Sequence, residues 1–174
     1  MDRPLQTKEA SPVPRGDMNT QHPPTSEATF CRARTIRFSD CDPAGIVFYP
    51  QYFVMFNGLV EDWIDEGLGI GYRDLIIERR IGLPTVRIEA DFRAVSRMGD
   101  PVQLCLAVER LGTRSLTLQV SCTGMDGGIR MQMQQVLVTT SLVDHRAIDI
   151  PPDLRQAIDA SISWRPQVEP RAGA

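Results

Sequence analysis

Between residues 51 and 66 the hydrophobic positions recur at the spacing of an α-helix. Apolar side chains share one face of this segment and polar side chains share the other: Tyr52, Phe53, Phe56, Leu59, Val60, Trp63 and Ile64 lie opposite Gln51, Asn57, Glu61, Asp62 and Asp65. Pro50 suits the first helical turn, where a missing N–H costs nothing, and Gly67 suits the C-terminal end. The pattern predicts one amphipathic helix over residues 51–66.

Alternating apolar and polar positions predict β-strands on both sides of this helix. Residues 30–38 form the first strand, with Phe30, Ala33, Ile36 and Phe38 expected near the core. Four long segments follow the helix: 84–96, 101–111, 115–123 and 128–143. Their length and the short turns between them predict an antiparallel meander, and a short helix is expected to begin near Pro152.

These elements together predict an α+β domain in which the helix packs against a curled antiparallel sheet. Such a sheet has exposed edge strands, and another subunit commonly covers such edges by strand pairing. Residues 1–29 are rich in Pro, Ser, Thr and Gln without apolar periodicity, which predicts a disordered N-terminal tail. The folded domain is expected over residues 30–164, followed by a loose tail over 165–174. No secretory segment is evident, so a cytoplasmic protein is expected.

Composition excludes several classes of chemistry. The net charge of −3 and the scattered arginines disfavour nucleic acid as a partner, and no apolar run is long enough to predict a membrane span. Lys8, in the N-terminal tail, is the only lysine, so the folded part has no Schiff-base or phosphate-loop amine. Histidine is nearly as scarce, because His22 also lies in the tail and only His145 remains. A catalytic site built on several histidines is therefore disfavoured.

The four cysteines, at positions 31, 41, 105 and 122, form no C-x-x-C pair and have no partnered histidine. A zinc site is therefore not expected. Their spacing is typical of small buried residues in a cytoplasmic protein, and they are predicted to be free thiols in the core.

Candidate chemistry lies where the first strand meets the helix. Asp40 and Asp42 precede Pro43-Ala44-Gly45 there, and one interpretation is that they only form a turn. The alternative is that Asp42 acts as nucleophile or general base, because the helix N-terminus beside it offers unpaired N–H groups to an oxyanion. That arrangement needs no lysine, histidine or metal, and it suits hydrolysis of a thioester.

The same D-x-D pair is compatible in principle with magnesium or phosphoryl transfer. Phosphatases with an aspartate nucleophile, however, use a threonine or valine just after the pair and a lysine elsewhere. Pro43 and Ala44 stand at those positions here, and the domain has no lysine. The composition therefore favours no metal and no separate cofactor.

The stretch DCDPAGIVFYPQYF, residues 40–53, resembles the hotdog-fold acyl-CoA thioesterases, and among them the 4-hydroxybenzoyl-CoA thioesterase type. The likeness continues through ERRIGLPTV (78–86), RSLTLQVSC (114–122) and HRAIDIP (145–151), so that it covers roughly residues 32–155. The first motif is the most specific of the four. The resemblance implies an antiparallel sheet wrapped around a long central helix, in subunits that form homodimers and often tetramers.

The resemblance also implies roles for individual residues. Asp42 matches the catalytic aspartate, and the backbone N–H of Tyr49 matches the oxyanion donor. Pro50 stands where many relatives carry a histidine, so catalysis is expected to depend on Asp42 alone. The remaining substrate contacts are expected at Gly45, Phe48 and Tyr52 for the acyl group, and at Arg114, Ser115 and Arg146 for CoA.

The expected reaction is hydrolysis of an acyl-CoA thioester, with an aryl-CoA such as 4-hydroxybenzoyl-CoA favoured by the aromatic residues, to a carboxylic acid and free CoA. A medium-chain aliphatic acyl group fills a similar volume. Two other functions are compatible with the sequence. One is a hotdog hydratase or dehydratase, although no histidine stands in the place that such an enzyme needs. The other is an acyl-CoA-binding domain without catalytic activity.

Overall fold

The computed structural model describes residues 30–163. The predicted tails over 1–29 and 165–174 lie outside the described residues. Five antiparallel strands form one sheet in the order β1-β4-β5-β6-β3, and a two-stranded sheet joins β2 to β7. The strands are β1 (Phe30–Thr35), β2 (Ile81–Gly82), β3 (Thr85–Phe92), β4 (Pro101–Leu111), β5 (Ser115–Gly124), β6 (Ile129–Val138) and β7 (Thr140–Ser141).

The helical segments are η1 (Phe38–Asp40), α1 (Tyr49–Asp62), η2 (Trp63–Gly67), η3 (Asp74–Glu78) and α2 (Pro152–Ser163). The predicted helix is thus confirmed as α1 and η2, which follow one another without a break and end at the predicted Gly67. The helix near Pro152 is confirmed as α2. Among the described residues, no helix is long and apolar enough to cross a membrane.

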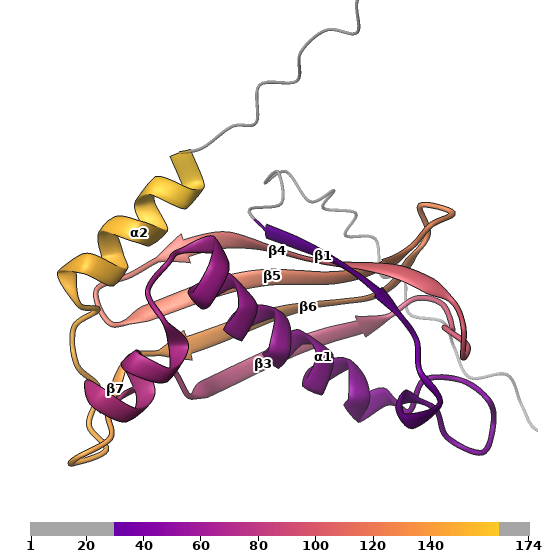
Figure 1. Cartoon of the computed structure of the whole chain (residues 1–174), viewed down its shortest axis with the longest axis horizontal. Coiled ribbons are helices and arrows are strands. Elements are labelled where there is room, and N and C mark those ends of the chain that lie inside the picture. Colours follow the sequence, from indigo (N-terminus) through magenta and orange to yellow (C-terminus); the bar gives the residue numbers. More distant parts are fainter. Residues whose placement is uncertain (1–29, 164–174) are drawn as a thin grey trace, which may run out of the picture.

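The core lies between α1 and one face of the large sheet, across which the helix runs (Figure 1). The apolar face of the helix is almost completely buried, with Phe56 exposed by 0% and Trp63 by 1%. Along β5, buried and half-buried residues alternate strictly, as the period of a strand with one covered face requires. This packing fixes where the N-terminus of α1 lies relative to the sheet.

Two expectations about the strands are wrong. Residues 84–143 do not form a simple meander, because β3 pairs with β6 at one edge while β1 pairs with β4 at the other. Phe38 is not in the core but 82% exposed, and Ala33 is exposed too. The strand ends at Thr35 and the chain enters the short η1 turn, so the alternation that placed Phe38 inside no longer applies.

Strand β3 is an open edge of the sheet. All eight of its residues are exposed, including the apolar side chains of Val86, Ile88 and Phe92. An unpaired edge with apolar side chains is a template for pairing with another strand. The prediction of an exposed edge is therefore confirmed.

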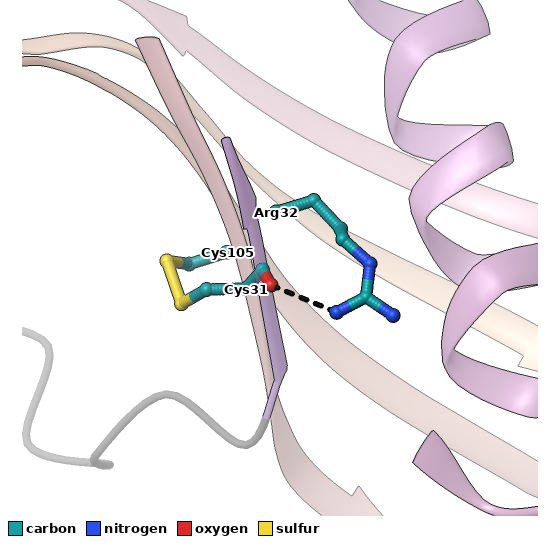
Figure 2. The surroundings of a disulfide bond; sticks show 3 residues. All are labelled: Cys31, Arg32 and Cys105. Carbon is teal, nitrogen blue, oxygen red and sulfur yellow. Dashed lines mark hydrogen bonds between the residues drawn. A yellow bond between two sulfur atoms is a disulfide. The ribbon is translucent and has the colours of Figure 1, made fainter. Parts of the chain in front are cut away.

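Cys31 and Cys105 are joined by a disulfide bond, which corrects the prediction that all four cysteines are free. The two residues lie directly opposite one another in the β1–β4 pair, with Cα atoms 4.2 Å apart. The bond lies on the side of β4 that faces away from α1 (Figure 2). Of the other two cysteines, Cys122 is buried as predicted, whereas Cys41 is only half-buried. A disulfide is the form that persists in oxidising compartments, and the cytoplasmic location stays a prediction.

Reducing this disulfide is expected to lower the stability of the protein by about 2–4 kcal/mol, because it closes a loop between residues that are 74 positions apart. Dithiothreitol should therefore lower the melting temperature by roughly 5–15 °C. The Cys41→Ser variant, which keeps the bond, should show the same shift, and a Cys31→Ser/Cys105→Ser double variant should show none. Four reactive thiols in the denatured, unreduced protein would contradict the assignment.

Candidate active site

The candidate site is a hairpin-like loop between η1 and α1 at one end of the sheet. Three backbone contacts close it: the Phe48 N–H donates to the Asp40 carbonyl (2.9 Å), Cys41 and Val47 form a bridge, and the Asp42 N–H donates to the Ile46 carbonyl (3.0 Å). The Val47 N–H also donates to the Ser96 carbonyl at 2.9 Å, which fixes the loop to the segment after β3. The chain that carries Asp42 is thereby held against the start of the helix.

Asp42 begins a tight turn. The Gly45 N–H donates to the Asp42 carbonyl at 2.9 Å, and Gly45 has a φ of +76°, which a residue with a side chain rarely adopts. The Ala44 N–H donates to Oδ1 of the Asp42 carboxylate at 2.8 Å. Within residues 30–163 no hydrogen bond holds the second oxygen, Oδ2. One carboxylate oxygen thus fixes the side chain while the other is free to react.

Tyr49 is the first residue of α1, and its N–H has no acceptor inside the helix. No other residue in the described part of the chain accepts a hydrogen bond from it. Pro50 follows and carries no N–H, so Tyr49 contributes the outermost amide of this helix end. The Phe48 N–H, next to Tyr49, is hydrogen-bonded to the Asp40 carbonyl, and Asp42 follows Asp40 by two residues. The backbone of Asp42 is therefore about 7 Å from that hydrogen bond. A carboxylate and an unpaired amide therefore lie at the same end of the molecule.

Aromatic rings surround the start of the helix. The Tyr49 ring makes edge contacts with Phe48 (5.4 Å between ring centres), Phe53 (6.5 Å) and Phe92 (6.2 Å). Phe48 and Tyr49 are 45% and 58% exposed, so they present an apolar surface beside the loop. Phe92 belongs to β3 and was missed by the sequence analysis, although its place in the strand alternation marks it as facing the helix.

Tyr52 differs from the other predicted acyl contacts. It is 3% exposed, and its hydroxyl is hydrogen-bonded to the Ser96 hydroxyl at 3.0 Å. Burial raises the pKa of Tyr52, so the phenol stays neutral. Tyr52 joins the helix to the segment after β3, and its role as a substrate contact stays a prediction.

Cys41, between the two aspartates, is not favoured as a nucleophile. Burial, together with the charges of Asp40 and Asp42, raises the pKa of the Cys41 thiol. A thiol is reactive as its thiolate, and these surroundings disfavour that form. The two carboxylates therefore remain the candidate reactive groups of the loop.

The three predicted CoA contacts lie elsewhere. Arg114 and Ser115 stand at the beginning of β5, and the Thr139 N–H donates to the Arg114 carbonyl at 2.8 Å, next to β7 and Arg146. The Asp42 loop lies at the other end of the sheet, beside the end of β5 (Figure 1). Since β5 has 10 residues, roughly 30 Å separate the two ends. Within one subunit the structure does not bring these arginines to Asp42.

Arg114 and Arg146, at the beginning of β5 and beside β7, have exposed acidic partners. The Arg114 Nε donates to the Asp149 carboxylate at 2.6 Å, and both side chains are more than half exposed. The Arg146 N–H donates to the Asp144 carboxylate at 3.3 Å. Within residues 30–163, no group of three or more His, Cys, Asp or Glu side chains is arranged to hold a metal ion.

Comparison with known proteins places this chain in a family. The model of the thioesterase-like superfamily matches residues 36–158, which is most of the described chain. The chain belongs to the thioesterase-like superfamily. The prediction of a thioester hydrolase is thereby confirmed, and so is the α+β hotdog architecture as far as an antiparallel sheet with a helix on one face.

Several named proteins are similar to this chain. A 1,4-dihydroxy-2-naphthoyl-CoA hydrolase from Synechococcus sp. is 29% identical over 136 residues, covering 72% of this chain and 81% of the relative. A 4-hydroxybenzoyl-CoA thioesterase from Pseudomonas sp. is 26% identical over 125 residues, covering 68% of this chain and 89% of the relative. A solved 1,4-dihydroxy-2-naphthoyl-CoA thioesterase from Synechocystis superposes with a TM-score of 0.69 at 21% identity, covering 75% of this chain and 95% of that one. At this level of identity, the likeness to the solved structure shows a shared fold alone.

Proposed function

We propose that this thioesterase hydrolyses an aryl-CoA with a hydroxylated ring, releasing the aryl carboxylic acid and free CoA. The observation that carries the proposal is the Asp42 carboxylate, fixed through Oδ1 beside the unpaired N–H of Tyr49. The aromatic surface of Phe48, Tyr49 and Phe92 supports a flat acyl group. The names of the relatives support the same class, and they favour 1,4-dihydroxy-2-naphthoyl-CoA alongside 4-hydroxybenzoyl-CoA.

In this mechanism Asp42 Oδ2 attacks the thioester carbonyl or takes a proton from the water that attacks it. Negative charge then develops on the carbonyl oxygen. The Tyr49 N–H and the positive end of the helix dipole stabilise that charge, because they are already oriented before the reaction. Collapse of the intermediate breaks the C–S bond and expels the CoA thiolate, which takes up a proton. Where water is the attacking group, the aryl acid is released at this step; where Asp42 is, water then hydrolyses the mixed anhydride, which releases the acid and restores the carboxylate. Neither route uses a metal or cofactor.

The working unit in this proposal is a homodimer formed through β3, in which the curled sheet of each subunit wraps its helix; pairs of such dimers would give the predicted tetramer. The exposed apolar edge of β3 supports it. When two copies of an antiparallel edge pair about a two-fold axis, the beginning of one strand lies beside the end of the other. Arg114 and Ser115 of one subunit would then lie at the end of the dimer that carries the partner's Asp42 loop. In this dimer, the proposed catalytic residues of one subunit and the proposed CoA contacts of the other would form one site.

The substrate class is tested by measuring thiol release from a panel of CoA thioesters with a thiol-reactive dye. We expect kcat/KM for 4-hydroxybenzoyl-CoA and 1,4-dihydroxy-2-naphthoyl-CoA to exceed that for octanoyl-CoA by at least about 10-fold, because the ring contacts are lost with an aliphatic chain. A preference for octanoyl-CoA would contradict the aryl assignment. Binding without thiol release from any thioester would indicate an acyl-CoA-binding domain, and formation of a double bond would indicate a dehydratase.

A further inference from the structure

Asp40, the other aspartate of the loop, has an environment unlike that of Asp42. It is only 4% exposed, whereas Asp42 is half-buried. Nη2 of Arg34 donates to both of its carboxylate oxygens, at 3.0 Å and 3.2 Å, and the Arg37 N–H donates to Oδ2 at 2.8 Å. A buried carboxylate with every oxygen engaged is not available to a substrate. Its function must be exerted through its neighbours.

The backbone of Asp40 reaches the helix. Its N–H donates to the Arg37 carbonyl at 3.0 Å, and its carbonyl accepts the N–H of Phe48 at 2.9 Å. Phe48 is the N-cap of α1 and immediately precedes Tyr49. Through Arg34 the same residue is tied to β1, and so to the sheet. Asp40 is therefore the one point in this loop where the sheet, the η1 turn and the start of α1 meet.

The two proposed catalytic groups lie on the two arms of the loop, which meet at the Asp40–Phe48 hydrogen bond. Asp42 follows Asp40 by two residues on one arm of the loop, and Tyr49 follows Phe48 by one residue on the other. The Asp40–Phe48 contact, which is the one of the three loop contacts next to the start of the helix, thus helps to set the separation between the Asp42 carboxylate and the Tyr49 N–H. A misplacement of about 1 Å in such a pair is enough to reduce turnover about 100-fold.

We propose that Asp40, held by Arg34, is a positioning residue that sets the distance between the Asp42 carboxylate and the Tyr49 N–H. The inference rests on the proposed thioesterase mechanism and adds a residue to it. Asp40 touches neither substrate nor reacting atoms. Its ion pair orients the η1 turn, the turn orients the Asp40 carbonyl, and that carbonyl fixes where the helix begins.

The test is to measure kcat and KM separately for Asp40→Asn and Arg34→Gln. Asp40→Asn keeps the size of the side chain but removes the charge that Arg34 pairs with. We expect kcat to fall about 10–100-fold in each variant, with KM changed by less than about 3-fold, because the aromatic surface and the CoA contacts are intact. The double variant should be no worse than the poorer single one, since both act through one ion pair. Arg34→Lys should recover much of the lost kcat.

A control is Asp153→Asn, which breaks a more exposed Arg–Asp pair, with Arg79 (2.8 Å and 3.0 Å), far from the loop. Its kcat should equal that of the wild type. The fraction of folded protein is measured for every variant by stoichiometric binding of a non-hydrolysable thioether analogue, so that kcat is expressed per competent site.

An Asp40→Asn protein whose kcat per competent site equals the wild-type value overturns the inference and leaves Asp40 with a folding role only. Additive losses in the double variant overturn it as well. Absence of thiol release from the wild-type protein on every thioester overturns the proposed function, and the inference with it. Loss of kcat in the variants of the pair, with recovery in Arg34→Lys, supports the proposal.

Discussion

We expect Asp42→Asn to lower kcat for thioester hydrolysis by at least about 1,000-fold and to leave the affinity for substrate nearly unchanged. Asparagine has the size of aspartate, and its amide oxygen still accepts the hydrogen bond from the Ala44 N–H. The turn and the start of the helix are thus preserved. What is lost is the oxygen to which the proposed mechanism assigns attack on the carbonyl or proton transfer from water, because an amide does neither at neutral pH.

The structure offers a close control for this variant. Asp126, in the loop between β5 and β6, likewise accepts a hydrogen bond from the N–H two residues ahead, that of Gly128, at 3.0 Å. Asp126→Asn should leave kcat unchanged, which shows that an aspartate in this kind of turn is not in itself important for turnover. A kcat within about threefold of the wild type in Asp42→Asn would refute the role assigned to this carboxylate.

The second large effect is recovery of activity in mixed dimers. Arg114→Ala should raise KM about 10–100-fold through the loss of a CoA contact, and Asp42→Asn should abolish turnover. If each site combines Asp42 of one subunit with Arg114 of the other, a mixed dimer of these variants contains one wild-type site and one doubly altered site. The purified mixed dimer should therefore show about half of the wild-type activity at low substrate concentration, and an unpurified random mixture, in which half of the dimers are mixed, about a quarter.

This experiment uses two tags on co-expressed chains, so that mixed dimers are purified by consecutive affinity steps. The control combines an Asp42→Asn chain with an Asp42→Asn/Arg114→Ala chain, and no dimer of these has an intact Asp42. It should stay inactive. Mixed Asp42→Asn and Arg114→Ala dimers without recovery would show that each subunit works by itself, and a monomer in light scattering would exclude the shared site altogether.

The elements that could be predicted from the sequence are those that depend on local patterns. The period of the apolar residues gives the helix, and the alternation over residues 101–111 gives β4 with its observed bounds. The helix begins two residues earlier than the pattern indicated, because Tyr49 and Pro50 occupy its first turn and do not face the core. Phe38 was misplaced because the strand ends at Thr35 and Phe38 is the first residue of the η1 turn.

Features that depend on contacts distant in sequence could not be predicted. The Cys31–Cys105 disulfide follows from the register of β1 on β4, and no spacing in the sequence reveals that register. The pairing of β3 with β6 is of the same kind. Asp42 was recognised as a candidate because it stands next to a helix start. The network around Asp40 became evident only with the fold, since it needs Arg34 in β1, Arg37 just before η1 and Phe48 just before α1.

The most direct test of the account is a crystal structure with an aryl-CoA analogue whose carbonyl is separated from sulfur by a methylene group, which prevents hydrolysis. The account predicts the analogue's carbonyl oxygen at about 3 Å from the Tyr49 nitrogen. It also predicts a carboxylate oxygen of Asp42 within about 3.5 Å of the carbonyl carbon, or of a water that lies against it. A carbonyl bound away from the Tyr49 N–H, with Asp42 out of reach of it, would contradict the mechanism.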